Sequence, residues 1–297
     1  MRSAAKGCEV ALRFGDADPD HVRDDGAAVE RLTAQLAGIG RLGVAFSGGV
    51  DSATLLALAV RALGPGRVVA LLGVSPSLAA DERAAAHDVA RFVGAPVVEV
   101  ETREGDRPAY RANGPDRCFH CKDELFATIG AEVLDRHGLD RLAYGENADD
   151  AVRPDRPGAR AATAHAVLRP LADAGLDKAA VRRIARALDL PCADKPAAPC
   201  LASRIPHHEP VTPAKLAQVE AAEHALRALG FTDCRVRHHG DVARVELPAA
   251  EIVRAAGDLR DDVRRAVVAA GFRFVAVDLA GIQSGAFTLP LVTVGRG

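Results

Sequence analysis

Tryptophan is absent from the 297-residue sequence, and two tyrosines and nine phenylalanines bring its aromatic content to only 4%. Proteins that bind single-stranded nucleic acid stack the bases on aromatic side chains, so this sequence offers few such platforms. A large net charge is also missing, because 38 Lys and Arg residues stand against 40 Asp and Glu residues. A surface that binds a polyanion needs a basic excess. We therefore expect no nucleic acid partner.

Long apolar runs are absent as well, so we expect no helix that spans a bilayer and no membrane partner. The first residues, Met1–Lys6, are not followed by the apolar segment of a secretion signal. Both absences predict a cytoplasmic protein. In that compartment the six cysteines are better explained as metal ligands, catalytic groups or buried thiols than as a disulfide framework.

A glycine turn that lacks the lysine of the usual P-loop occupies residues 47–52. It reads Ser-Gly-Gly-Val-Asp-Ser and lies between an apolar run, 42–46, and a helix-like stretch, 53–59. Paired glycines let backbone N–H groups turn inward, and the following helix adds unpaired N–H donors and the positive end of its dipole. The missing lysine argues against transfer of the γ-phosphate. This order predicts a pyrophosphate site, with a plain strand-to-helix turn as the alternative.

Short apolar runs alternate with helical patterns from about residue 29 to 190, which predicts an α/β fold with a doubly wound parallel sheet. The expected strands are 42–46, 68–74, 97–100 and 142–145. Ligands of such sheets bind where the strands end, here near Ser47, Ser75 and Gly145. Residues 191–213 lack periodicity and predict a long connection that borders the site.

A second, smaller α+β unit is expected after that connection. Thr212 is a plausible N-cap of a helix that ends near Gly230. Two strands, two helices and a last strand then follow, at 234–238, 242–247, 249–256, 259–270 and 272–279. The predicted organisation is a disordered tail over 1–28, a nucleotide-binding domain over 29–210 and a substrate or oligomerisation domain over 211–297.

Cys118 and Cys121 form a C-x-x-C pair directly before a helix-like stretch, 124–137. At a helix N-terminus beside Arg117 and Lys122, the local field is expected to lower the pKa of both thiols. Open alternatives are a redox pair and a Zn²⁺ site that uses Cys118, Cys121, Cys200 and His120. The other cysteines share no motif with a partner and are expected to be incidental: Cys8, Cys192 and Cys234.

Arg235 and Arg237 lie two residues apart in a predicted strand, so both side chains project from one face of it. Two guanidinium groups on one face could jointly hold a phosphate or a carboxylate with bidentate geometry. A solvated surface is the alternative.

The glycine turn resembles the PP-loop, S-G-G-x-D-S, of the ATP pyrophosphatase superfamily. From about Leu42 onward the chain also resembles the LarE family, the ATP-dependent sacrificial sulfur insertases that help to make the nickel-pincer cofactor of lactate racemase. The segments that carry this resemblance are 115–126, 145–150, 200–206 (Cys-Leu-Ala-Ser-Arg-Ile-Pro) and 235–241 (Arg-Val-Arg-His-His-Gly-Asp). The PP-loop indicates only the superfamily, whereas the last two segments together are far more specific.

The resemblance implies an adenine nucleotide alpha hydrolase-like fold and an enzyme that adenylylates a carboxylate of pyridinium-3,5-dicarboxylate mononucleotide. Sulfur then displaces AMP and leaves a thiocarboxylate. ATP and Mg²⁺ are the implied cofactors, with Asp51 as a Mg²⁺ ligand. The implied ATP-binding residues are Ser47, Gly48, Gly49, Asp51, Ser52, Ser75, Asn147, Asp150, Arg169 and Lys195. The implied substrate-binding residues are Ser203, Arg204, Arg235, Arg237 and Glu246, with Glu223 as a weaker candidate.

The resemblance leaves two sources of sulfur. Some family members sacrifice the sulfur of one cysteine, and others carry a [4Fe–4S] cluster on three cysteines. Because this chain has Cys118, Cys121 and Cys200, we favour the cluster, whose fourth iron is open to bind an additional sulfide. Sacrifice of Cys200 is the alternative. Since family members are often hexamers, we also expect a homo-oligomer.

Three other functions compete with this interpretation. A PP-loop tRNA thiolase would need a basic face or an RNA-binding module, and the sequence shows neither. An amide-forming synthetase that uses ammonia would need no cysteines near the site. A nucleotide sensor with a degenerate site is disfavoured because Asp51 and Ser52 are intact.

Overall fold

The computed structural model describes residues 18–152 and 157–282 of the chain. Its larger sheet has the strand order β3-β2-β1-β4, with β1 at Leu42–Phe46, β2 at Val68–Val74, β3 at Val97–Glu101 and β4 at Arg141–Tyr144. All adjacent strands of this sheet are parallel. The α/β fold and its parallel sheet are therefore confirmed, and the predicted strand bounds are correct to within one residue.

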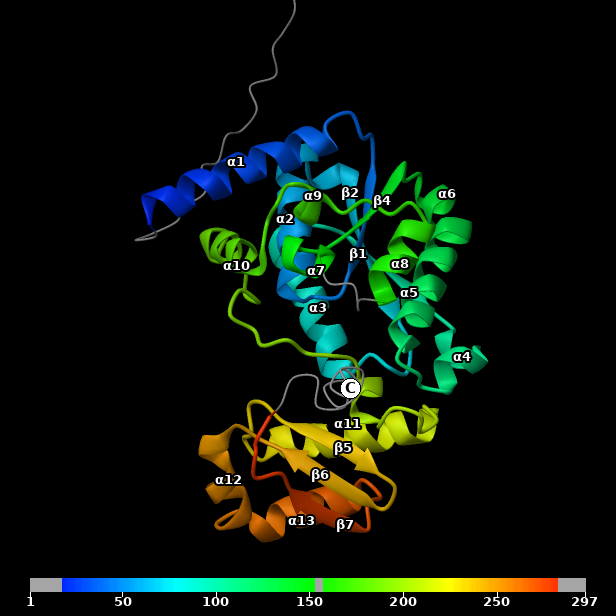
Figure 1. Cartoon of the computed structure of the whole chain (residues 1–297), viewed down its shortest axis with the longest axis vertical. Coiled ribbons are helices and arrows are strands. Elements are labelled where there is room, and N and C mark those ends of the chain that lie inside the picture. Colours follow the sequence, from blue (N-terminus) through cyan, green and yellow to red (C-terminus); the bar gives the residue numbers. More distant parts are fainter. Residues whose placement is uncertain (1–17, 153–156, 283–297) are drawn as a thin grey trace, which may run out of the picture.

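Helices cover both faces of this sheet (Figure 1). On one face lie α1 (Pro19–Leu36), α2 (Val50–Leu63), α3 (Ala80–Val93) and α10 (Lys178–Ala187), which share a core with Val68, Ala70 and Leu72 of β2. The intervening residues Val69 and Leu71 pack on the other face, against α5 (Arg117–Thr128) and α8 (Pro157–Ala164). Side chains of a strand alternate between its faces, so this division is the one expected of a doubly wound sheet.

Short elements connect these helices and strands. They are η1 (Pro65–Arg67), η2 (Glu104–Asp106), α4 (Pro108–Arg111), the π-helical turn η3 (Ile129–Val133), α6 (Leu134–His137), α7 (Ala148–Ala151), α9 (Pro170–Asp173) and η4 (Leu201–Arg204). Among the described helices, none combines the length and the apolar character needed to cross a bilayer.

The second sheet has the order β5-β6-β7, drawn below the parallel sheet in Figure 1. Its elements are α11 (Pro213–Ala228), β5 (Arg235–His239), β6 (Val242–Glu246), α12 (Ala249–Ala256), α13 (Arg260–Ala269) and β7 (Phe274–Val277). Strands β5 and β6 are antiparallel, and β6 and β7 are parallel. The core of this unit also contains Tyr110 of α4 and the partly buried Cys121 of α5. The two units therefore share packed side chains.

Two local predictions need correction. The expected disordered tail over 1–28 is wrong for its last part, because α1 begins at Pro19, where the Asp18 carboxylate accepts a 2.9 Å hydrogen bond from the Asp20 amide. Buried Ala28 and Leu32 then hold the helix against the core. Residues 1–17, with Cys8, lie outside the described residues. The second correction is the start of the cysteine-bearing helix, which begins at Arg117 rather than at residue 124.

Candidate active site

The glycine turn joins the carboxyl end of β1 to the first residue of α2. Gly48 has a positive φ of 72°, and a Cβ there would lie 2.8 Å from the Cα of Ala86. The Ser52 hydroxyl donates to the Gly49 carbonyl at 3.0 Å and accepts from the Ser47 amide at 3.2 Å. The Ser47 and Ser52 hydroxyl oxygens are 3.3 Å apart. Two hydroxyls, a glycine backbone and a helix N-terminus therefore meet in one turn, which suits an anion.

Gly145, at the end of β4, lies directly against this turn. A Cβ at residue 145 would be 2.6 Å from the Ser52 amide nitrogen and 2.8 Å from the Asp51 carbonyl carbon.

We expect Gly145→Ala to lower the free energy of unfolding by about 1–3 kcal/mol, because backbone atoms must move apart. Chemical denaturation measures this change. Gly26→Ala in α1 is the control: its Cβ would have no neighbour within 4 Å. That substitution should be neutral or stabilising by about 0.5–1 kcal/mol, and an equal loss in both variants would contradict the close approach.

The carboxylate of Asp51 lies among polar groups from two other segments. Its Oδ1 accepts from the Asn147 side chain at 3.2 Å, and its Oδ2 accepts from the Lys178 ammonium at 2.5 Å. Asn147 also caps α7, because its side chain accepts from the Asp150 amide at 3.0 Å and donates to the Asp150 carboxylate at 3.2 Å. The structure thus brings together Asp51, Asn147 and Asp150, three of the residues that the resemblance implies for ATP binding.

Lys178 is the residue at this location that sequence reasoning missed. It opens α10, and a positive charge at a helix N-terminus opposes the helix dipole. That mismatch was the available signal, because a lysine in the first turn needs a partner outside its own helix. Asp51 is that partner.

Ser75, Arg169 and Lys195, the other predicted ATP-binding residues, each contact a glutamate carboxylate. Ser75 donates to the buried Glu104 carboxylate at 2.5 Å. Lys195 pairs with Glu82 of α3 at 2.6 Å, and Arg169 lies 3.5 Å from Glu146. Lys195 and Arg169 keep further N–H donors beyond these pairs, so both can still contact a phosphate.

Cys118 and Cys121 lie in the first turns of α5, and Cys200 caps η4. Arg117 joins these two elements, because it donates to the Asn113 side chain at 2.5 Å and to the Ala202 carbonyl at 2.8 Å. Cys118 and Cys200 are exposed, and Cys121 is half-buried.

The expected lowering of both thiol pKa values is wrong for Cys121. Burial raises the pKa of this thiol, and the negative charges of Cys200, Glu104 and Cys118 raise it further; they outweigh the opposing effect of Arg117. The Lys122 ammonium lies 4.6 Å from the centre of the Tyr144 ring. Because Arg117 of α5 donates to the Ala202 carbonyl, η4 and its N-cap residue Cys200 pack beside the helix that carries Cys118 and Cys121.

The three thiols do not stand as ligands around one point. Within 18–152 and 157–282, no three His, Cys, Asp or Glu side chains already form a group that could hold a metal ion. The His120 imidazole, the fourth ligand of the zinc alternative, lies 3.1 Å from the Asp116 carboxylate. Cys192 and Cys234 are buried, and burial raises the pKa of Cys234 to about 12.

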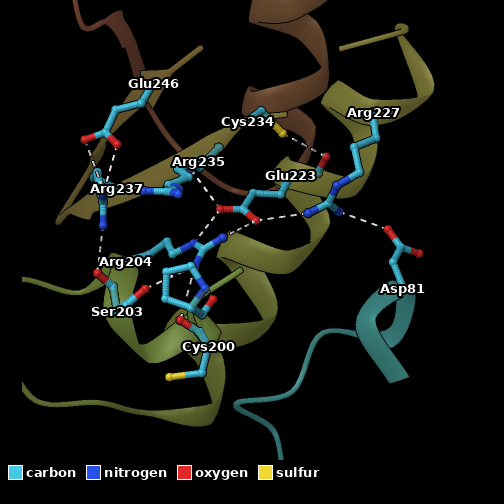
Figure 2. A network of polar contacts seen from close by, with 12 residues as sticks. Asp81, Cys200, Ser203, Arg204, Glu223, Arg227, Cys234, Arg235, Arg237 and Glu246 are labelled. Carbon is cyan, nitrogen blue, oxygen red and sulfur yellow. Dashed lines mark hydrogen bonds and ion pairs between the residues drawn. The ribbon is translucent and has the colours of Figure 1, made fainter. Parts of the chain in front are cut away.

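A buried ionic network links η4 to the second unit (Figure 2). Glu223, which is 1% exposed, accepts from Arg204 Nε at 2.8 Å and from Arg204 Nη2 at 3.1 Å. The same carboxylate accepts from the Val236 amide at 3.0 Å and from Arg227 at 3.2 Å. Arg227 reaches across to Asp81 of α3 at 2.9 Å.

Arg235 and Arg237 are both 3% exposed, so a solvated surface is not what the structure shows. The guanidinium of Arg237 forms a bidentate pair with Glu246 at 2.9 and 2.8 Å and donates to the Ser203 carbonyl at 2.9 Å. Arg235 donates to the Ala197 carbonyl at 3.3 Å. Burial lowers the pKa of Arg235, and the charges of Arg204 and Arg237 lower it further. The guanidinium groups of Arg204, Arg235 and Arg237 therefore lie close to one another, beside η4.

Glu223 is expected to be essential for folding. Replacing it with glutamine leaves the Arg204 guanidinium buried without its charge partner, so we expect Glu223→Gln to lower the free energy of unfolding by about 3–5 kcal/mol. Denaturant titration measures this loss. The matched control is Arg227→Gln, because the Arg227 side chain is 31% exposed. This variant should lose about 1 kcal/mol or less of its free energy of unfolding. An equal loss in both variants would contradict a larger contribution from the buried Arg204–Glu223 pair.

Comparisons with known proteins identify relatives of this chain. The model of the asparagine synthase family matches residues 27–127. An uncharacterized protein of Synechocystis sp. is 39% identical over 258 residues, which are 86% of this chain and 95% of that protein. The pyridinium-3,5-bisthiocarboxylic acid mononucleotide synthase of Lactiplantibacillus plantarum is 34% identical over 257 residues, 86% of this chain and 91% of that enzyme. An uncharacterized protein of Methanocaldococcus jannaschii is 30% identical over 135 residues, 46% of this chain and 52% of that protein.

Proposed function

This chain belongs to the family of the pyridinium-3,5-bisthiocarboxylic acid mononucleotide synthase, and from that premise we propose that it is an ATP-dependent sulfurtransferase of the LarE type. Its substrate is then the pyridinium-3,5-dicarboxylate mononucleotide. Its product is the thiocarboxylate used in making the nickel-pincer cofactor of lactate racemase.

The reaction has two steps. A carboxylate at neutral pH is a poor electrophile, so one of its oxygens first attacks the α-phosphorus of ATP and releases pyrophosphate. The resulting mixed anhydride has AMP as a good leaving group. A thiolate or sulfide then attacks the acyl carbon, AMP departs with its electron pair, and a carbon–sulfur bond replaces the carbon–oxygen bond.

The glycine turn is the proposed site of the first step. Backbone N–H groups at Gly48 and Gly49 and the hydroxyls of Ser47 and Ser52 hold the pyrophosphate. Asp51 and the Asn147–Asp150 pair form the wall beside it, and the remaining proposed ATP contacts are Ser75, Arg169 and Lys195. The residues fit Mg²⁺, because this ion is usually bound through one or two carboxylates plus substrate phosphates rather than by an all-protein cage. When bound through Asp51, Mg²⁺ would neutralise phosphate charge.

The second step is proposed to use the three cysteines that gather around Arg117. Three thiolates are the right donor set for a [4Fe–4S] cluster with one open iron, so we propose that Cys118, Cys121 and Cys200 hold one. When bound, the cluster would supply a sulfide. In the alternative, the Cys200 thiolate displaces AMP to form a thioester, and β-elimination then removes the Cα proton and breaks the Cβ–Sγ bond, which leaves the thiocarboxylate on the substrate and dehydroalanine at residue 200. In both cases Arg117 holds η4 beside α5 through the Ala202 carbonyl.

One observation carries the proposal: η4 is bonded to the cysteine helix on one side and to the buried arginines on the other. Arg117 of α5 donates to the Ala202 carbonyl at 2.8 Å, and Arg237 of β5 donates to the Ser203 carbonyl at 2.9 Å. Arginines of this kind suit the phosphate and carboxylates of a pyridinium mononucleotide. The proposed substrate-binding residues are Ser203, Arg204, Arg235, Arg237 and Glu246. They would bring the activated carboxylate to the sulfur.

Product analysis tests this function. With ATP, Mg²⁺ and the pyridinium dicarboxylate, we expect AMP and pyrophosphate to form, and neither to form when the dicarboxylate is left out. Release of ADP would contradict the proposal. Filter binding with tRNA tests the thiolase alternative, and ammonia in place of the sulfur source tests the amide-forming one; we expect neither tRNA retention nor an amide product.

The proposed division of labour follows the two units. Residues 29–210 bind ATP and carry the cysteines, and residues 211–297 contribute to the substrate site and to assembly. We propose a cytoplasmic homo-oligomer, with the hexamer as the form suggested by the LarE resemblance. Sedimentation of the whole chain tests the assembly, and a monomer at micromolar concentration would contradict it.

A further inference from the structure

Lys178 lies in the ATP site, yet neither the motifs of the sequence nor the names of the relatives give it a role. Its ammonium is 2.5 Å from Asp51 Oδ2, and Asp51 belongs to the glycine turn that the proposed function assigns to ATP. The inference below rests on that function.

The backbone at Lys178 is fixed by its neighbours. The Asp177 carboxylate caps α10 by accepting from the Ala180 amide at 2.7 Å, and the Lys178 amide donates to Asp149 at 3.0 Å. Buried Val181 and Ile184 hold the same helix against the core. The base of the Lys178 side chain is therefore held in place beside Asp51 of the glycine turn.

The ammonium group is much less constrained than the backbone. The Lys178 side chain is 38% exposed and that of Asp51 is 23% exposed, and ion pairs with this exposure contribute little to stability. A long lysine side chain can exchange one anionic partner for another within its reach. Its present partner is thus replaceable.

A divalent cation and Lys178 compete for the same oxygen. Asn147 already donates to Asp51 Oδ1 at 3.2 Å, and the ammonium occupies Oδ2. Mg²⁺ bound through Asp51 would therefore compete with the ammonium for the charge and the lone pairs of this carboxylate. Once displaced, the ammonium stands at the N-termini of both α2 and α10, whose positive dipole ends favour an anion at the same place.

We propose that Lys178 is a partner-exchanging residue of the ATP site. In the nucleotide-free protein it holds Asp51, and when Mg²⁺ and ATP bind it moves from Asp51 to the oxygens of the departing pyrophosphate. A merely structural role is redundant, because Asp25 also anchors α10 through a bidentate ion pair with Arg183 at 2.8 Å.

The test compares Lys178→Met and Lys178→Arg with wild type, and uses Lys215→Met as a matched control. Lys215 is a half-buried lysine that pairs with Glu209, 3.3 Å away, in the second unit. Thermal unfolding first establishes that all variants fold. The first measurement titrates Mn²⁺ into the nucleotide-free protein and follows free Mn²⁺ by electron paramagnetic resonance. Mn²⁺ prefers the same oxygen ligands as Mg²⁺.

We expect Lys178→Met to bind Mn²⁺ about threefold or more tighter than wild type, because the competing ammonium is gone. The control and Lys178→Arg should bind Mn²⁺ as wild type does. In ATP–pyrophosphate exchange, Lys178→Met should raise the KM for pyrophosphate about tenfold or more, and Lys178→Arg should recover part of this loss.

An unchanged Mn²⁺ affinity in Lys178→Met, or an unchanged KM for pyrophosphate, would overturn the inference. Failure of the proposed function has a different signature. Wild type would then catalyse no exchange with the pyridinium dicarboxylate. In that case, titration of pyrophosphate into the Mn²⁺-loaded protein would replace kinetics as the test of whether Lys178 binds pyrophosphate. In that titration, weaker binding by Lys178→Met supports the inference, and equal binding overturns it.

Discussion

Cys200→Ala is expected to abolish thiocarboxylate formation while it leaves ATP–pyrophosphate exchange close to the wild-type rate. Cys200 is exposed at the start of η4, where Arg204 donates to its carbonyl, and Arg117 holds η4 to the helix that carries Cys118 and Cys121. Loss of this sulfur removes either the donor itself or a cluster ligand, so we expect sulfur transfer to fall by about 10³-fold or more. Adenylylation is proposed to take place at the glycine turn, which contains no thiol. Mass spectrometry of the product and exchange of labelled pyrophosphate measure the two steps separately.

Cys192→Ala is the matched control for this substitution. Cys192 is 2% exposed and packs in the core of the parallel sheet, so its loss should spare both steps. Loss of exchange together with transfer in Cys200→Ala would contradict a division between the adenylylation and sulfur sites. Iron analysis of anaerobic protein distinguishes the donors: loss of iron in each of the three cysteine variants supports the cluster, whereas dehydroalanine at residue 200 after turnover supports sacrifice.

Asp51→Asn is expected to lower ATP–pyrophosphate exchange by about 10³-fold or more, because the neutral amide cannot neutralise a divalent cation beside the phosphates. The substitution preserves shape and removes one negative charge. It also removes the charge partner of Lys178, which is 2.5 Å away. Exchange of labelled pyrophosphate into ATP, with the dicarboxylate present, measures the effect.

Asp194→Asn provides the comparison for a lost carboxylate. Asp194 is 72% exposed and pairs with Arg186 on the outside of the same unit. We expect exchange to remain at the wild-type rate in this variant. Wild-type exchange in Asp51→Asn as well would mean that the glycine turn is not where ATP is cleaved.

The strands of the parallel sheet could be read from the sequence because each is a short apolar run that begins and ends abruptly. Both faces of β2 are covered, so Val68–Leu72 has no polar alternation to confuse with a helix. The glycine turn was equally readable, since Gly48 adopts a positive φ that glycine tolerates. Local sequence therefore predicts the strands of this half of the fold and its glycine turn.

The surroundings of each charged side chain could not be predicted in the same way. The spacing of Arg235 and Arg237 predicts that both lie on one face of the strand. Only the folded chain shows that Glu246 forms a bidentate pair with the Arg237 guanidinium. The pKa of Cys121 likewise depends on burial, which a helix-terminus argument does not contain. Contacts between segments distant in sequence determine these properties.

Lys178 illustrates the same limit most clearly. It stands 127 residues from Asp51 in the chain, and no periodicity relates the two. The fold brings them together because α2 and α10 pack on one face of the sheet, and the contact joins the first turns of the two helices. Its place at a helix N-terminus was the one unusual local feature.

Transfer of oxygen from the substrate to AMP tests the central claim most directly. With the pyridinium dicarboxylate labelled with oxygen-18 in its carboxylates, attack on the α-phosphorus predicts AMP that carries one labelled oxygen in each turnover. AMP without label, formed alongside thiocarboxylate, would contradict an acyl-adenylate intermediate and with it this account of the site.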